Sequence, residues 1–494
     1  MMSTDKPTFY YVDAHAGSGK TYSAHKYIAS AGGFFTIATQ TNDLSKQQAE
    51  DLLAEFGVKA RVIRLENGVS KTCTERYVRH CKDLRGSTAI INYKVALQDL
   101  EAARNQNLIV DEFNPPVEKF ELQEDISATR AFIGNLIKAV PCEFPGVLEV
   151  IDTDDTAEIA ESGKSKQNSL KEHVVRVCKR AHSPHHRMFV KETNYVDFRS
   201  GLPDAEGVSD DDDESKRKLS LYAWLQPSIL KNYRSVTFMG ANRQNSKLFL
   251  YWKDKVNWIE HPEIKGERYD TFDHKAPLID WRHMSEDLLS WSHLSNNIGY
   301  EYFKESVAEV IAREYPNEEY LVTLSAKDDG TWTCPNGRVV SANPMGLNAF
   351  QDKYLAVHLA PLIPSRMDVF MWNAIAGVSE AELVIAQYCE MLYQFFTRTA
   401  VRDGERYSKS KNQKRLVFIG LDRPTIDVLR EIFGVEKQSE LLVVPALNGY
   451  VKPPRKTRSD KKPDDAKRAA KSARQAERRA EKRAAKAAAA EMRV

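Results

Sequence analysis

The sequence predicts an α/β protein with two lobes, each built on a parallel sheet. Up to about residue 300, polar segments of helical pattern alternate with the apolar runs TFYYVDA, FFTIAT, ARVIRL, TAIIN, LIVDE and SVTFMG. A second series of β-prone runs follows: YLVTLS, LAVHLA, LVFIG and LLVVP. Strands that alternate with helices are typical of parallel sheets. We therefore expect a first lobe over 1–300 and a second over 301–450, with a hinge near residue 300.

Composition indicates a globular protein of a reducing compartment. The chain has 494 residues, of which 42% are hydrophobic, and this suffices for two or three compact domains. Its six cysteines lack the close pairs of a zinc site or a secreted disulfide framework. No apolar run approaches the ~20 residues of a membrane span, and no basic N-terminal leader is present. We expect a cytoplasmic protein, or one of the host cytoplasm if a virus encodes it, with no membrane partner.

The C-terminal segment 451–494 differs in charge from the rest of the chain. Residues 452–494 hold 16 Lys and Arg against 6 Asp and Glu, whereas the whole chain has a net charge of only +2. The segment is rich in alanine and lacks large apolar side chains, so it has little to bury against a core. We expect a basic arm that binds nucleic-acid phosphates without sequence preference. A solubilising or partner-binding tail remains the alternative.

The most informative motif is AHAGSGKT at 14–21, which lies between a predicted strand and a predicted helix. Small residues let backbone N–H groups close around phosphate oxygens, and the following helix N-terminus adds positive potential. The Lys20 ammonium would reach the β- and γ-phosphates, and the Thr21 hydroxyl would hold Mg²⁺. The predicted nucleotide-binding residues are Ala16, Gly17, Ser18, Gly19, Lys20 and Thr21. The chain is therefore expected to bind ATP and Mg²⁺.

Two adjacent carboxylates, Asp111 and Glu112, follow the apolar run at 107–110. Open α/β sheets bind ligands at the carboxyl ends of their strands. Asp111 would hold Mg²⁺, and Glu112 would orient or deprotonate the water that attacks the γ-phosphoryl group. Taken alone, such a run is more often a strand that enters a polar loop. Together with the glycine-rich motif it predicts hydrolysis.

A third pattern brings positive charge from the C-terminal half. Gln394, Arg398 and Arg402 are spaced i, i+4 and i+8, so they are expected on one side of one helix. Two guanidinium groups on that side could face a phosphate and stabilise charge on the transferring group. The alternative is a solvent-facing basic stripe on an amphipathic helix.

The order of these segments resembles the helicase-like ATPases of superfamilies 1 and 2. Residues 14–21 resemble motif I, residues 39–44 with Gln47 motif Ia, 90–97 motif Ib, and 111–112 motif II. Residues 236–242 are similar to motif III, 346–350 to motif V and 394–402 to motif VI. The resemblance implies two RecA-like lobes with ATP between them, a nucleotide contact at Gln394, and catalytic roles for Lys20, Glu112, Arg398 and Arg402. It also implies nucleic-acid contacts at Thr39, Thr41, Asn92 and Asn348.

The match departs from the family pattern in three places. Ala14 replaces the first glycine of motif I. Motif VI has one extra residue between its glutamine and first arginine, so Arg398 and Arg402 could exchange roles. About 125 residues separate motif II from motif III, which predicts an inserted subdomain at about 120–220.

The combined interpretation is an ATP-dependent helicase or translocase that moves along a strand. Single-stranded or forked DNA is favoured over RNA, and replication or recombination proteins are candidate partners of the basic tail. One alternative is a viral genome-packaging ATPase, which predicts a nuclease among the carboxylates of the C-terminal half. Another is a non-catalytic scaffold that binds nucleic acid and is switched by nucleotide.

Overall fold

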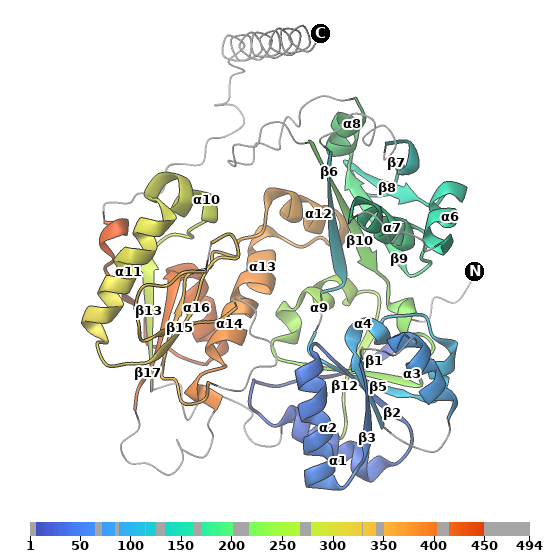
Figure 1. Cartoon of the computed structure of the whole chain (residues 1–494), viewed down its shortest axis with the longest axis horizontal. Coiled ribbons are helices and arrows are strands. Elements are labelled where there is room, and N and C mark those ends of the chain that lie inside the picture. Colours follow the sequence, from blue (N-terminus) through green and yellow to red (C-terminus); the bar gives the residue numbers. More distant parts are fainter. Residues whose placement is uncertain are drawn as a thin grey trace, which may run out of the picture. The chain divides into compact units, whose positions relative to one another are not determined.

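The computed structural model describes residues 6–64, 72–83, 88–113, 115–124, 134–162, 169–200, 217–266, 278–328, 330–341, 350–402 and 414–448 (Figure 1). Its contacts divide the chain into a unit at Met1–Asn448 and a unit at Gly449–Val494. Asn348, with the motif V candidate around it, and the basic tail lie outside the described residues. The first unit holds three sheets, A, B and C.

Sheet A has seven parallel strands in the order β12-β1-β11-β5-β2-β4-β3. Their bounds are β1 Thr8–Asp13, β2 Phe35–Thr39, β3 Ala60–Ile63, β4 Thr88–Asn92, β5 Asn107–Asp111, β11 Ser235–Gly240 and β12 Asn257–Glu260. All five residues of β2 are buried. Strands covered on both faces appear in the sequence as continuous apolar runs, and this is why β2, β4 and β5 could be predicted, whereas β12 was not.

Helices and short turns connect the strands of sheet A. They are α1 Lys20–Ala31, α2 Asn42–Phe56, α3 Cys73–Lys82, α4 Tyr93–Ala96, η1 Glu101–Asn105, η2 Pro227–Leu230, η3 Arg243–Asn245 and α9 Lys247–Trp252. Side chains cap four of the helices: Thr41 caps α2, Thr72 forms a capping box with Glu75 at α3, Asn92 caps α4 and Ser246 caps α9. Gly57 ends α2 with φ 68°, in the left-handed conformation that glycine adopts at little cost.

Sheet B is antiparallel and occupies the stretch between β5 and β11. Its order is β6-β10-β9-β8-β7. The strands are β6 Val117–Glu124, β7 Lys138–Pro141, β8 Val147–Ile151, β9 His186–Lys191 and β10 Arg217–Leu225. The helices α6 Asp154–Ser162, α7 Ser169–Ala181 and α8 Glu192–Ser200 accompany the sheet. Alternate residues of β10, among them Leu219 and Leu221, share a core with Val174 and Val177 of α7. The long separation between motifs II and III is thus filled by a sheet with its own hydrophobic core.

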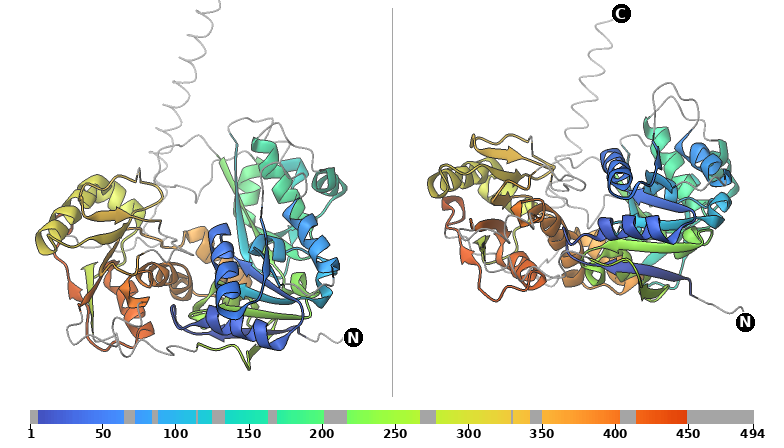
Figure 2. Two further views of the ribbon diagram at one scale, coloured as in Figure 1. Left: turned by 60° about the horizontal axis from the view of Figure 1, so that its bottom comes forward. Right: turned by 90° about the horizontal axis from the view of Figure 1, so that it is seen from below.

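Sheet C has six parallel strands in the order β15-β14-β16-β17-β13-β18. Their bounds are β13 Ile279–Ser285, β14 Tyr320–Thr323, β15 Gly337–Val339, β16 Leu355–His358, β17 Leu416–Asp422 and β18 Glu440–Leu441. The accompanying elements are α10 Trp291–His293, η5 Leu294–Ile298, α11 Tyr300–Glu314, α16 Arg423–Ile432 and η8 Pro445–Leu447. Sheet C begins with β13, before residue 300. The predicted α/β class with two parallel sheets is confirmed, and Figure 2 gives two further views of them.

A helical segment lies between β16 and β17. Its first helix packs on sheet B, whereas its last part belongs to the hydrophobic core of sheet C. It comprises α12 Arg366–Ala376, α13 Glu380–Val384, the π-helical turn η6 Ile385–Cys389, α14 Glu390–Phe396 and the short turn η7 Ala400–Arg402. Trp372 of α12 lies against Trp224 of β10, with ring centroids 4.8 Å apart. Asp368 accepts a hydrogen bond from the Tyr222 hydroxyl at 2.7 Å and pairs with Lys119 at 3.4 Å. Figure 1 shows α12 beside β6 and β10. This helix belongs to the hydrophobic cluster of sheets A and B.

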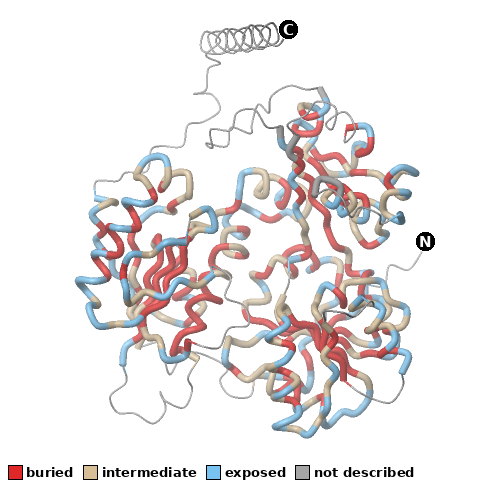
Figure 3. Tube along the Cα trace, in the orientation of Figure 1, coloured by how far each residue is buried: buried red, intermediate tan, exposed pale blue. Residues whose placement is uncertain are grey.

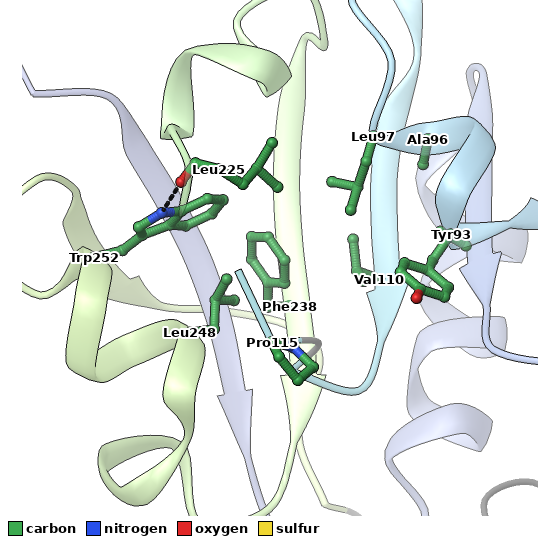
Figure 4. Close-up of a pocket in the computed structure, with 10 residues that line it drawn as sticks. Tyr93, Ala96, Leu97, Val110, Pro115, Leu225, Phe238, Leu248 and Trp252 are labelled. Atoms are coloured by element: carbon green, nitrogen blue, oxygen red, sulfur yellow. Dashed lines mark hydrogen bonds between the residues drawn. The ribbon is translucent and has the colours of Figure 1, made fainter. Parts of the chain in front are cut away.

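Buried residues concentrate on the strands of the three sheets (Figure 3). A small apolar cavity lies on sheet A between α4 and α9, lined by Tyr93, Leu97, Val110, Phe238 and Leu248 among others (Figure 4). None of the site residues predicted from the sequence lines it. Among the described helices, no single one has the length and hydropathy of a membrane span. Helix α12 and the stretch Glu380–Phe396 meet both criteria only as a pair bent by 114°.

Candidate active site

The glycine-rich motif forms a tight loop between β1 and α1. Gly17 and Gly19 have φ values of 79° and 90°, which a residue with a side chain rarely adopts. The Ser18 backbone N–H donates to the His15 carbonyl at 3.1 Å and closes the turn. The Ser18 hydroxyl is buried and has no hydrogen-bond partner among the described residues. A loop with left-handed glycines, an unpartnered hydroxyl and a helix N-terminus is suited to bind phosphate.

The Lys20 ammonium turns back onto this loop. It donates to the carbonyl oxygens of Ala14 at 2.5 Å and His15 at 2.9 Å. Burial lowers the pKa of Lys20, while the nearby carboxylates of Glu112 and Asp111 oppose this shift. The ammonium is thus positioned inside the loop and beside the carboxylates of β5. Thr21 occupies the next position, in the first turn of α1.

Asp111 ends β5 and is 9% exposed. Its Oδ2 accepts a hydrogen bond from Gln48 Nε2 of α2 at 2.6 Å. Burial, and then the charge of Glu112, raise the pKa of Asp111 to about 6, although Lys20 acts in the opposite direction. A carboxylate that is costly to ionise in the folded protein is stabilised by a cation placed next to it. Asp111 therefore fits the role of a metal ligand.

Glu112 has an unusual backbone conformation, with φ at 89°. Its N–H donates to the Met239 carbonyl of β11 at 2.7 Å, which holds the residue in this conformation. Left-handed backbone in a residue other than glycine costs of order 1–3 kcal/mol and is often found at functional sites. The conformation directs the chain away from the sheet immediately after the second carboxylate.

The predicted single helix through Gln394, Arg398 and Arg402 is wrong in one respect. Helix α14 ends at Phe396, and Arg402 closes the separate turn η7. The Thr397 and Thr399 hydroxyls donate to the carbonyls of Gln394 and Phe396, at 3.4 and 2.7 Å. Threonine side chains that bond to nearby backbone in this way compete with helix continuation.

Both arginines nevertheless face the glycine-rich loop and the carboxylates. A β carbon built on Gly17 would lie 3.5 Å from Arg402 Cγ. Arg398 is 4% exposed and donates to Gln394 Oε1 at 3.3 Å. Burial lowers the pKa of both guanidinium groups, that of Arg402 to about 9, with Arg398 as the second cause. The pair is therefore not a solvent-facing stripe.

Contacts between the glycine-rich loop and α14 join residues of sheets A and C. The Ala16 backbone N–H donates to the Tyr393 hydroxyl at 2.8 Å, so this predicted phosphate donor already has a partner. Gln394 Nε2 lies 3.5 Å from Glu112 Oε2, at the limit of a hydrogen bond. Residues from both halves of the chain thus converge on one site.

The predicted nucleic-acid contacts share one edge of sheet A but have local partners. Thr39 and Asn92 are opposite each other at the ends of β2 and β4. The Thr39 hydroxyl pairs with Ser45 at 2.6 Å, and Thr41 caps α2. Asn92 caps α4 and donates to the Gln40 carbonyl at 3.0 Å. These three side chains support the loops that border the edge. Asn348 lies outside the described residues.

Four further residues at the site were not predicted from the sequence. Gln48 contacts Asp111, and Tyr393 contacts the glycine-rich loop. Glu390 accepts a hydrogen bond from Gln394 at 3.0 Å, and Asn242, after β11, lies close enough to oppose the rise of its pKa. Gln48 is next to Gln47 of the motif Ia candidate, and Glu390 precedes Gln394 by one helical turn. Their spacing from these predicted residues was therefore a weak indication that they belong to the site. Within the described ranges, no group of three or more His, Cys, Asp or Glu side chains could hold a metal ion.

Comparisons with known proteins give matches at the level of structure. No protein-family model and no curated protein matches the chain. Xpd4 of S. tokodaii is 10% identical, with a TM-score of 0.44 over 88% of this chain and 96% of that one. A DEAD box protein of Methanococcus jannaschii is 11% identical, with a TM-score of 0.28 over 87% of each chain. The DUF1998 helicase MrfA bound to DNA and AMPPNP is 11% identical, with a TM-score of 0.28 over 88% of this chain. The chain spans 49% of that MrfA structure.

Proposed function

We propose that this protein is a nucleic-acid-dependent ATPase of helicase type, which couples ATP hydrolysis to movement along a strand. The observation that carries the proposal is the convergence of two sets of residues. Lys20, Asp111 and Glu112 lie at the carboxyl edge of sheet A. Gln394 and the two arginines reach the same place from the segment that precedes β17. A site assembled from two halves can link chemistry to their relative movement.

The charges of the site suit a triphosphate. The pKa values of Lys20, Arg398 and Arg402 are all lowered by burial, so each cation carries an unfavourable desolvation cost. An anionic ligand between them would offset that cost. In binding it, Lys20 would exchange the carbonyls of Ala14 and His15 for phosphate oxygens.

Magnesium would be held by Thr21 and Asp111. Two protein ligands suit this ion, because Mg²⁺ usually takes one or two ligands from the protein and the others from phosphate and water. When bound, Mg²⁺ would neutralise phosphate charge. Asp111 presents one oxygen to Gln48, and this fixes the orientation of the carboxylate.

In the proposed reaction, Glu112 accepts a proton from the attacking water and Gln394 helps to orient that water. Arg398 and Arg402 would stabilise charge on the transferring phosphoryl group. An arginine in this role typically contributes ~10³–10⁵ in kcat. Arg402 is the first candidate, because its Cγ lies 3.5 Å from the position of a β carbon built on Gly17. Arg398→Ala and Arg402→Ala compared side by side would decide between the two arginines.

The test is ATP hydrolysis by the purified protein without nucleic acid and with single-stranded DNA, duplex DNA or single-stranded RNA. Stimulation by one of these, lost in Glu112→Gln, would support the proposal and identify the track, for which DNA is our expectation. Nucleotide binding without hydrolysis under any condition would overturn it in favour of a nucleotide-switched scaffold.

A further inference from the structure

Glu390 lies between the two halves of the site and has no role in the reaction described so far. It is the first residue of α14 and directly follows the π-helical turn Ile385–Cys389. Turns of this kind inside helices occur frequently at functional sites. Its Oε1 accepts a hydrogen bond from Gln394 Nε2, one helical turn further along, and Asn242, which follows β11, lies close enough to oppose the rise of its pKa. Glu390 thus contacts Gln394 directly, and Gln394 in turn reaches Glu112 of the other half.

The hydrogen bonds around Gln394 leave its amide one favourable orientation. Nε2 donates to Glu390 Oε1 at 3.0 Å and lies 3.5 Å from Glu112 Oε2. Oε1 accepts from Arg398 Nη2 at 3.3 Å. A guanidinium group only donates and the Glu112 carboxylate only accepts, so a flipped amide would lose its contacts with Arg398 and Glu112. Without Glu390, only the long contact with Glu112 would hold the amide nitrogen in place.

We infer that Glu390 is a positioning residue of the hydrolytic site. It fixes the Gln394 amide, and through it the Arg398 guanidinium, relative to Glu112. The inference rests on the proposed ATPase function and deepens it, because it names the group that orients Gln394 between Glu112 and Arg398.

The electrostatic surroundings predict which substitutions Glu390 tolerates. Burial raises the pKa of Glu390 to about 8, and the charge of Glu112 contributes to the shift, while Gln394, Asn242 and Lys20 oppose it. The Tyr393 and Cys389 side chains also face the group. At neutral pH the acid is therefore largely uncharged. A glutamine has the same shape and keeps an acceptor oxygen, whereas a leucine fills similar space without one.

The experiment compares Glu390→Gln with Glu390→Leu, with kcat and KM for ATP measured in the presence of the stimulating nucleic acid. Small misplacements of catalytic groups can cost about 10²-fold in rate. We expect Glu390→Leu to lower kcat by roughly 10- to 100-fold with KM for ATP nearly unchanged. The kcat of Glu390→Gln should stay within about threefold of that of the unmodified protein, which corresponds to a difference in activation free energy below ~1 kcal/mol. Glu305→Leu, an exposed change on α11, is the matched control.

Three results would overturn the inference. They are an unchanged kcat in Glu390→Leu, an equal loss in Glu390→Gln, and an effect confined to KM. Thermal unfolding of each variant shows whether it folds. If Glu390→Leu does not fold, Glu390→Ala replaces it, and the same loss of kcat is expected. If the unmodified protein hydrolyses no ATP, the proposed function fails together with the inference. If only the Glu390 variants behave unexpectedly, the proposed function stands.

Discussion

Replacement of Asp111 by asparagine is expected to stabilise the protein and to abolish its activity. Asp111 is buried, and its pKa is raised from 3.8 to about 6. The folded state therefore disfavours the ionised form. The cost to stability is absent below the unfolded pKa, grows as the pH rises towards 6, and is fully present above it.

The size of this cost follows from the shift. A change from 3.8 to about 6 corresponds to ~3 kcal/mol at pH 7.5. The asparagine side chain would carry no charge, and its carbonyl oxygen could still accept from Gln48. Part of the gain is lost because Lys20 no longer has a carboxylate beside it at this position. We expect Asp111→Asn to raise the free energy of unfolding by about 1–3 kcal/mol at pH 7.5, and by less at pH 5.

Urea unfolding in EDTA measures this change, because no divalent cation then offsets the charge of Asp111. The control is Asp422→Asn, since burial raises the pKa of Asp422 to about 6 as well, and its side chain caps α16. Both variants should be more stable than the unmodified protein at pH 7.5, but only Asp111→Asn should lose Mg²⁺-dependent ATP hydrolysis. A less stable Asp111→Asn, or one with full activity, would refute the reasoning.

Three further predictions concern contacts of the site and of α12. Gly17→Val should weaken nucleotide binding at least tenfold in a fluorescent-nucleotide titration, because φ is 79° and Arg402 Cγ lies 3.5 Å from the added carbon; unchanged affinity would contradict this. Tyr393→Phe leaves the Ala16 N–H without its partner, so thermal unfolding without nucleotide should show a loss of ~1–2 kcal/mol, and an equal or higher stability would argue against the contact. Trp372→Ala should cost ~3–5 kcal/mol in urea unfolding, whereas Arg366→Ala, an exposed change on the same helix, should cost little.

The parallel sheets could be predicted because their strands are buried on both faces. The runs at β2, β4 and β5 are apolar throughout, and this signal depends on sequence alone. Strand β13, IDWRHMS, contains charged residues and was not recognised. The strands of sheet B were also missed, since β6 pairs with β10 across about a hundred residues of sequence. Such pairing depends on tertiary structure.

The sequence identified residues that carry the proposed chemistry of the site, but it did not show the contacts between the two halves of the chain. Lys20 and Asp111 belong to recognisable local motifs, so their roles could be predicted from the spacing of the residues around them. Tyr393 is an ordinary buried aromatic residue in the sequence, and only the fold places its hydroxyl on the Ala16 N–H. The end of α14 was predicted wrongly because helical spacing does not show the competing hydrogen bonds of Thr397 and Thr399.

The position of α12 restricts how the two halves can separate. Trp372 and Met371 are buried in the cluster of sheets A and B, although the chain before and after the helical segment belongs to sheet C. Exposing these side chains would cost several kcal/mol, more than the few weak hydrogen bonds at the nucleotide site provide. We therefore expect α12 to stay packed on sheets A and B when the two halves separate. Opening would then be a rotation about this helix, and displacement would increase with distance from it towards the glycine-rich loop.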